Sequence, residues 1–133
     1  MIKKIGIPKE VKKDEGRVSL IPDHISQFTG IADIFIETGA GIGSGFSDQD
    51  YISAGAKVID TAEELYKISE IICKVKEPQL NEYDLLRPEH ILFGYLHLAS
   101  NIQLTKKLLD KKLSAIATEM IMDNGTYPLL IPM

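Results

Sequence analysis

The sequence contains one cysteine, Cys73, among 133 residues. A single cysteine rules out a disulfide within the chain and a cysteine-rich zinc site, and we expect no metal. Positive charge is also scarce, because 15 lysines and arginines against 19 aspartates and glutamates give a net charge of −4. Proteins that bind nucleic acid need clustered positive charge, so this balance argues against a nucleic-acid partner.

Long hydrophobic runs are missing as well. No apolar segment approaches the roughly 20 residues of a membrane-spanning helix. The N-terminal segment, residues 1–6, is too short and turns polar too soon for a signal peptide. We therefore expect a cytoplasmic protein without a membrane partner. The length corresponds to one domain, and 44% hydrophobic with 26% charged residues is typical of a globular one.

Short apolar segments alternate with helical patterns along the chain. The patterns predict strands over residues 4–8, 32–37, 57–59, 71–75, 91–96 and 114–118. They predict helices over residues 23–29, 48–54, 61 to about 66, and 100 to about 112. This alternation is typical of βαβ units with right-handed crossovers, so it predicts an α/β fold with a mostly parallel sheet.

The last predicted helix has the clearest local signals. Ser100 and Gln103 have the spacing of a capping box, which favours a helix start at this point. Leu104, Leu108 and Leu109 follow, and we expect them to form one apolar face.

A glycine-rich segment, residues 39–45, follows a predicted strand and precedes a predicted helix, as a dinucleotide-binding fingerprint does. Asp60 lies close to where a ribose-binding acid would be. The register fails, because the third glycine of the fingerprint falls on Ser44 or Phe46. The next helix is also too short for a full Rossmann crossover. We interpret the segment as a loop that needs positive φ at several positions, with cofactor binding as the alternative.

Charged side chains follow three of the predicted strands, and ligands of open α/β sheets bind at that edge. Arg17 lies in the loop after the first strand. Lys74 and Lys76 close the fourth strand, with a spacing of two that puts both on one face, and His97 follows the fifth. A guanidinium can grip a carboxylate with two hydrogen bonds, and a histidine exchanges protons near neutral pH. One Arg, one Lys and one His would together suit a small α-keto or α-amino acid.

Each candidate also has a purely structural alternative. Arg17 could pair with Asp14 or Glu15 at the surface, where an ion pair contributes little to stability. Lys76 could be the solvated end of a strand, and His97 could be a hydrogen-bonded core histidine.

The remaining candidates receive structural interpretations only. We expect Lys74 to face solvent, His24 to lie exposed on a helix and His90 to be a turn residue. Tyr95 and Met120 are assigned to packing.

The motifs around these residues resemble the N-terminal domain of the alanine dehydrogenase and pyridine nucleotide transhydrogenase family. They occur in family order along nearly the whole chain, as Ile7-Pro8-Lys9-Glu10, Glu15-Gly16-Arg17-Val18-Ser19-Leu20-Ile21-Pro22, Gly39-Ala40-Gly41, Ala54-Gly55-Ala56, Lys74-Val75-Lys76-Glu77-Pro78, Leu96-His97-Leu98-Ala99 and Pro128-Leu129-Leu130-Ile131-Pro132-Met133. The segments at Lys74 and at His97 look more like alanine dehydrogenase than transhydrogenase.

The resemblance implies a Rossmann-like, open, mostly parallel sheet with helices on both faces. It also implies an enzyme of L-alanine catabolism, the reversible oxidative deamination of L-alanine to pyruvate and ammonia with NAD as hydride acceptor. In that family the residue matching Arg17 binds the substrate carboxylate. The residue matching Lys76 binds near the carboxylate and carbonyl oxygens, and the one matching His97 serves as acid/base or polarising group. Met133 is expected to contact the cofactor.

The family also has a second, NAD-binding domain, and nothing of it lies in these 133 residues. We therefore expect residues 1–133 to be a substrate-binding N-terminal domain, inactive alone, with NAD bound mainly by the missing domain. The apolar end, residues 127–133, favours a cut fragment. The family suggests a homo-oligomer, with a hexamer as the expected form. Two alternatives are a domain of the NAD(H)-binding subunit of a proton-translocating transhydrogenase and a stand-alone binding module of the same fold.

Overall fold

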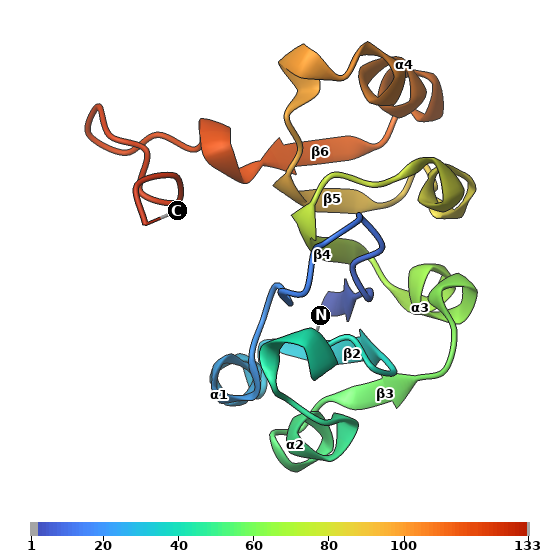
Figure 1. Cartoon of the computed structure of the whole chain (residues 1–133), viewed down its shortest axis with the longest axis vertical. Helices are drawn as coiled ribbons and strands as arrows, with labels where there is room; N and C mark the ends of the chain where they lie inside the picture. Colours follow the sequence, from blue (N-terminus) through green and yellow to red (C-terminus); the bar gives the residue numbers. More distant parts are fainter. Residues whose placement is uncertain (1–2, 133) are drawn as a thin grey trace.

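The computed structural model describes residues 3–132, which contain one six-stranded sheet (Figure 1). Neighbouring strands all pair in parallel, in the order β3-β2-β1-β4-β5-β6 found in Rossmann sheets. The strands are β1 (Lys3–Ile7), β2 (Ala32–Glu37), β3 (Lys57–Ile59), β4 (Ile71–Lys76), β5 (Ile91–Tyr95) and β6 (Ser114–Ala117). The predicted α/β class and parallel sheet are confirmed.

Short helices connect the strands. The α-helices are α1 (Pro22–Ile25), α2 (Asp48–Ser53), α3 (Ala62–Ile68) and α4 (Ile102–Lys111). The 3₁₀ segments are η1 (Ser26–Phe28), η2 (Ile42–Ser44), η3 (Leu80–Leu85), η4 (Leu98–Ser100) and η5 (Thr118–Met120). All four predicted helices are present, the first as α1 continued by η1. Within residues 3–132, no helix is long and apolar enough to cross a membrane.

The start and the apolar face of α4 differ from the prediction. The side chain of Asn101, not of Ser100, caps the helix by accepting a hydrogen bond from the backbone N–H of Leu104. Leu104 and Leu108 are buried, but Leu109 is 70% exposed. Residues four apart share a helix face, whereas Leu109 is five residues beyond Leu104 and lies about 140° around the axis.

Two apolar cores lie on opposite faces of the sheet. Figure 1 shows α3 and α4 on one side and α1 on the other. The core on the α1 side covers β1 and β2, and it consists of Ile5, Ile7, Ile25, Ile34, Ile36, Ala40, Tyr51 and Ala56. The core on the α4 side covers β4 and β5, and it consists of Tyr66, Ile72, Tyr83, Leu86, Leu92, Leu96, Leu104 and Leu108. Because these strands are parallel, their carboxyl ends lie at one edge of the sheet, between the two packed faces.

The strand order places a topological switch point between β1 and β4. The chain proceeds from β1 outward to β3, then crosses back to β4 and continues to β6. Ligands of open α/β sheets bind in the crevice at such a point, beyond the carboxyl ends of the strands. The loop that contains Arg17 follows β1, Lys76 ends β4, and His97 follows β5.

The glycine-rich segment supports the loop that contains Arg17. Gly39 and Gly45 have positive φ, as expected for this loop, but Gly43 is required for a different reason. A Cβ atom on Gly43 would lie 2.4 Å from the carbonyl oxygen of Gly16, so only glycine allows the two backbones to approach. The Ser44 hydroxyl also donates a hydrogen bond to that oxygen, at 3.1 Å. The segment therefore packs against the Arg17 loop.

This contact predicts that Gly43→Ala destabilises the fold by about 1–3 kcal/mol, because backbone faces backbone and neither can yield cheaply. Gly16→Ala is the matched control, since its Cβ would lie 3.5 Å from the Gly43 carbonyl oxygen, an ordinary contact. Urea unfolding of both variants checks the prediction. Equal stability of the two would contradict it.

Candidate functional site

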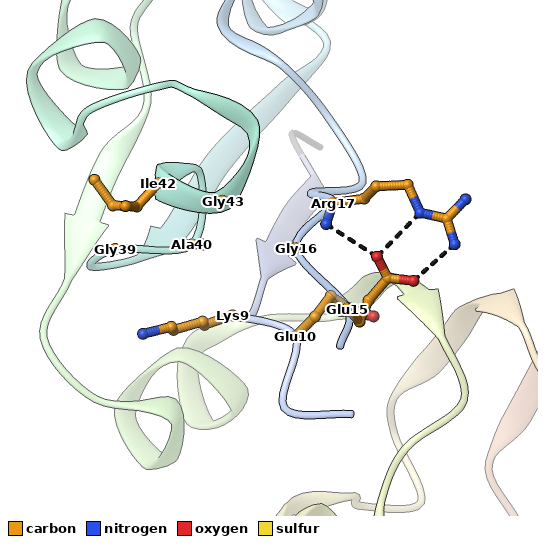
Figure 2. Close-up of a pocket in the computed structure, with 9 residues that line it drawn as sticks. All are labelled: Lys9, Glu10, Glu15, Gly16, Arg17, Gly39, Ala40, Ile42 and Gly43. Carbon is orange, nitrogen blue, oxygen red and sulfur yellow. Dashed lines mark hydrogen bonds and ion pairs between the residues drawn. The ribbon is translucent and has the colours of Figure 1, made fainter. Parts of the chain in front are cut away.

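The Arg17 guanidinium is held by Glu15, two residues earlier in the same loop (Figure 2). The Glu15 carboxylate accepts hydrogen bonds from Arg17 Nε at 3.0 Å, from Nη2 at 2.7 Å and from the Arg17 backbone N–H at 2.9 Å. The Arg17 side chain is 54% exposed and that of Glu15 only 7%. The pairing with Glu15 considered from the sequence is thus present. The pair is a bidentate one, with the geometry by which arginine binds carboxylates.

A second cation, Lys76, also acts on the Glu15 carboxylate. The pKa of the Glu15 carboxyl is lowered from 4.5 to about 2, chiefly by hydrogen bonds from Arg17, and the charge of Lys76 makes a smaller contribution to this lowering. Glu15 and Arg17 also line a cavity of about 250 Å³, together with Lys9, Glu10, Gly16, Gly39, Ala40, Ile42 and Gly43. Glu15 therefore links the loop after β1 to the end of β4.

Lys74 is buried, which corrects the expectation that it faces solvent. Its side chain is 1% exposed, and its ammonium lies 3.0 Å from Glu10 Oε2 and 2.8 Å from Glu82 Oε1. The Tyr66 hydroxyl donates a hydrogen bond to the same Glu82 oxygen at 3.1 Å. A buried charge must be paired, and here two carboxylates surround one ammonium. Burial raises the pKa of Glu10, while the Lys74 charge opposes that rise.

Lys76 does not share a face with Lys74, which is a second correction. Cys73 pairs with Phe93 and Lys76 pairs with Tyr95, so β4 has one more residue than β5 between these pairs. Such a β-bulge reverses the side from which the following side chain projects. Lys76 therefore lies beside its partner Tyr95, with its ammonium 5.5 Å from the centre of the ring, a cation–π contact.

His97 is exposed at the end of β5 and is not a core histidine. Its backbone is left-handed, with φ of 48°, a conformation that is uncommon for residues other than glycine. The Glu119 carboxylate accepts the His97 backbone N–H at 2.8 Å and so holds this turn. The imidazole ring lies 4.8 Å from the ring of Tyr95, centre to centre.

Tyr95 connects the candidate residues. Its ring contacts both Lys76 and His97, and it lines a cleft of about 480 Å³ that Arg17 also borders. Cys73, Val75 and Phe93 form part of the apolar wall of that cleft. The structure thus brings Arg17, Lys76 and His97 to one edge of the sheet, linked through Glu15 and Tyr95.

The other sequence-based assignments have mixed outcomes. His24 is exposed, as expected. His90 does lie in the turn before β5, but it is buried, with ring hydrogen bonds to the Tyr66 carbonyl and the Arg87 N–H. Met120, assigned to packing, is 70% exposed. Met133 lies outside the described residues.

Three residues of this edge were missed from the sequence. Tyr95 was assigned to packing alone, and Glu10 and Glu119 were not singled out. Glu10 lies three residues after the end of β1, so the criterion that identified Arg17 could have found it. Glu119 gives no such signal, because its partners Leu96 and His97 are 23 and 22 residues away in the sequence. The contact of Tyr95 with Lys76 depends on the bulge and gives no signal either.

Comparison with known proteins shows the family to which the chain belongs. The family described as "Alanine dehydrogenase/PNT, N-terminal domain" matches residues 6–133. The chain belongs to this family. The alanine dehydrogenase of Methanococcus maripaludis is 46% identical over 131 residues, which are 97% of this chain and 35% of that protein.

Solved structures of the alanine dehydrogenase/PNT family agree with the fold. An L-alanine dehydrogenase has a TM-score of 0.92 and 46% identity, covering 97% of this chain and 36% of that one. A transhydrogenase from Sinorhizobium meliloti has a TM-score of 0.84 and 28% identity, covering 90% of this chain and 36% of that one. The chain therefore spans about a third of the length of the relatives it matches.

The Glu15–Arg17 pair of this alanine dehydrogenase/PNT domain predicts a pH-dependent stability. A carboxyl with a lowered pKa stabilises the fold above its ordinary value of 4.5, and that contribution is lost as the pH falls toward 2. We expect Glu15→Gln to lower the thermal midpoint at pH 7. The loss in the free energy of unfolding should be less than about 1 kcal/mol, because Arg17 is half exposed. The difference from the unsubstituted protein should vanish between pH 4.5 and 2.

Thermal melts across this pH range check the prediction. Glu89→Gln is the control and should match the unsubstituted protein throughout, because the Glu89 side chain is 63% exposed and its surface ion pair contributes little. A Glu15→Gln deficit that persists unchanged at pH 2 would contradict the assignment of the stability to this carboxylate.

Proposed function

We propose that this chain is the substrate-binding domain of an NAD-dependent L-alanine dehydrogenase, which converts L-alanine reversibly to pyruvate and ammonia. The main support is the 46% identity to an alanine dehydrogenase along 97% of the chain. The identity to the transhydrogenase structure is lower, at 28%. The placement of Arg17, Lys76 and His97 at the ends of β1, β4 and β5 agrees with this function, because a small keto acid can be reached from all three strands at the switch point.

Arg17 binds the substrate carboxylate in this proposal. Its guanidinium already makes the bidentate contact to a carboxylate, that of Glu15. The substrate carboxylate would take the place of Glu15, or share the guanidinium with it. Glu15 therefore keeps the side chain of Arg17 oriented while the site is empty.

Lys76 and His97 act at the reacting carbon. The Lys76 ammonium stabilises the negative charge that develops on the carbonyl oxygen of pyruvate, and His97 gives or takes a proton there. The Tyr95 ring contacts both side chains, so it fixes the spacing between them.

The cofactor would be bound mainly by a domain outside these residues. NAD, when bound, accepts hydride from the substrate carbon. The glycine-rich segment does not suit its pyrophosphate, because the Gly16 backbone covers Gly43. Residues 1–133 are in this proposal a cytoplasmic, substrate-binding N-terminal domain that is inactive alone. The intact enzyme is proposed to be a homo-oligomer, with a hexamer as the expected form, and Met133 is proposed to contact NAD.

The function is tested by NADH oxidation, followed at 340 nm, with the full-length protein, pyruvate and ammonia. We expect turnover that requires both pyruvate and ammonia, and none from residues 1–133 alone. A full-length protein that does not oxidise NADH with pyruvate and ammonia, but transfers hydride from it to a second nicotinamide nucleotide, would instead be a transhydrogenase.

Arginine at position 17 should matter for its shape as well as its charge. We expect Arg17→Lys in the full-length enzyme to raise the KM for pyruvate about 10–100-fold, or about 1.4–2.8 kcal/mol, because an ammonium cannot make the two parallel hydrogen bonds. Steady-state kinetics with pyruvate and NADH varied separately provide the measurement.

The matched control is Arg87→Lys, because Arg87 donates its hydrogen bonds to the Tyr66 and Lys67 carbonyls, away from the cleft. That variant should keep the KM for pyruvate. If both substitutions changed the KM equally, Arg17 would have no special part in carboxylate binding.

A further inference from the structure

The direction of the Lys76 side chain depends on the bulge in β4. In a regular strand, Lys76 would project from the same face as Lys74, into the buried core on the α4 side. The extra residue between the Cys73–Phe93 and Lys76–Tyr95 pairs turns it to the face of Tyr95. Whatever holds the bulge therefore decides whether the Lys76 side chain reaches Tyr95, which lines the cleft.

One carboxylate spans the bulge. Glu10 Oε1 accepts the backbone N–H of Lys76 at 2.6 Å, and Glu10 Oε2 accepts a hydrogen bond from Lys74 Nζ at 3.0 Å. These two contacts lie on either side of Val75, the residue between the lysines. The Glu10 side chain is 3% exposed, so water competes little for its oxygens.

The strand opposite is shaped to accept the bulge. A Cβ atom on Gly94 of β5 would lie 2.7 Å from the carbonyl oxygen of Lys74. Glycine at this position leaves the space into which the bulged backbone projects. The contacts of Glu10 on one side and the space at Gly94 on the other favour this one backbone path.

A second ion pair ties the same loop to the same strand end. Lys12 Nζ lies 2.5 Å from Glu77 Oε1, directly after Lys76. The loop that follows β1 contains Glu10, Lys12, Glu15 and Arg17. Before it reaches Arg17, it contacts β4 through Glu10 and the residue after β4, Glu77, through Lys12. The relative position of Arg17 and Lys76 is thereby fixed through the loop.

We propose that Glu10 is a positioning residue, which holds the β4 bulge and thereby directs Lys76 to the substrate. The proposal rests on the proposed function, in which Lys76 binds the substrate. The Glu10 side chain is 3% exposed and both of its oxygens are taken by Lys74 and the Lys76 backbone N–H, so it acts through Lys76 and not on the substrate. Displacement of a binding group by about 1 Å is enough to lower catalytic efficiency strongly.

Two variants of the full-length enzyme separate positioning from stability. In Glu10→Gln, both partners of the side chain are donors, so the amide NH₂ must face one of them and that contact is lost. Glu10→Asp keeps the charge beside Lys74, but it is one methylene too short to reach both lysines. Glu10→Asp also provides the test if Glu10→Gln does not fold.

Glu82→Gln is the matched control. Glu82 is equally buried and also pairs with Lys74, but its other partners are the Tyr66 hydroxyl and the Gln79 N–H. It contacts the same ammonium without touching the Lys76 backbone. A role that is only structural would therefore affect Glu10 and Glu82 variants alike.

The first measurement is steady-state kinetics. We expect Glu10→Gln and Glu10→Asp to raise the KM for pyruvate about tenfold while the KM for NADH stays within about twofold. Glu82→Gln should lose thermal stability and keep the KM for pyruvate. An unchanged KM in both Glu10 variants, or an equal rise in Glu82→Gln, would overturn the proposal.

The second measurement does not need turnover. Reductive methylation followed by mass spectrometry gives the labelling rate of Lys76 relative to Lys106, which is exposed on α4. This ratio should change by about threefold or more in the Glu10 variants, because the surroundings of the Lys76 amine change, and stay constant in Glu82→Gln. A constant ratio in all variants would refute the positioning. If the unsubstituted enzyme did not convert pyruvate, the proposed function would fail while this ratio still decided the role of Glu10.

Discussion

The ion cluster around Lys74 is the interaction on which the stability of the fold at the carboxyl edge depends. One ammonium is buried between the carboxylates of Glu10 and Glu82, and the Tyr66 hydroxyl completes the group. These residues come from β4, the loop after β1, η3 and α3. Removal of one partner from such a buried group costs about 3–5 kcal/mol, because the remaining charges are left unpaired. The cluster thus joins four segments at the carboxyl edge of the sheet.

Most of the fold could be predicted from the sequence because its signals are local. Alternating apolar residues and Pro or Gly at the ends located the strands, and parallel order followed from the alternation of strands with helices. Errors arose where one contact decides between neighbours. Asn101 caps α4 in place of Ser100, one residue earlier in the sequence. Leu109 is exposed and falls outside the apolar face, although its neighbour Leu108 is buried in it.

The candidate site was only partly predictable, for a physical reason. The positions of Arg17, Lys76 and His97 follow from strand ends, which the sequence indicates. The burial of Lys74 and the direction of Lys76 do not, since both depend on one extra residue in β4 relative to β5. A bulge arises from pairing with a neighbouring strand, and no periodicity within β4 itself reveals it.

The contact between Glu15 and Arg17 has a consequence for selectivity. On the proposed function, an incoming keto acid enters by ion exchange, in which one carboxylate replaces another on the same guanidinium. The charge of the Arg17 guanidinium is then balanced only by a ligand that carries a carboxylate, as pyruvate and zwitterionic L-alanine both do. An analogue without a carboxylate, such as the amide of pyruvate, cannot replace the negative charge of Glu15 on the guanidinium. On the proposed function it therefore does not displace Glu15 and does not bind. On the proposed function, the domain therefore selects ligands by their carboxylate before it selects them by shape.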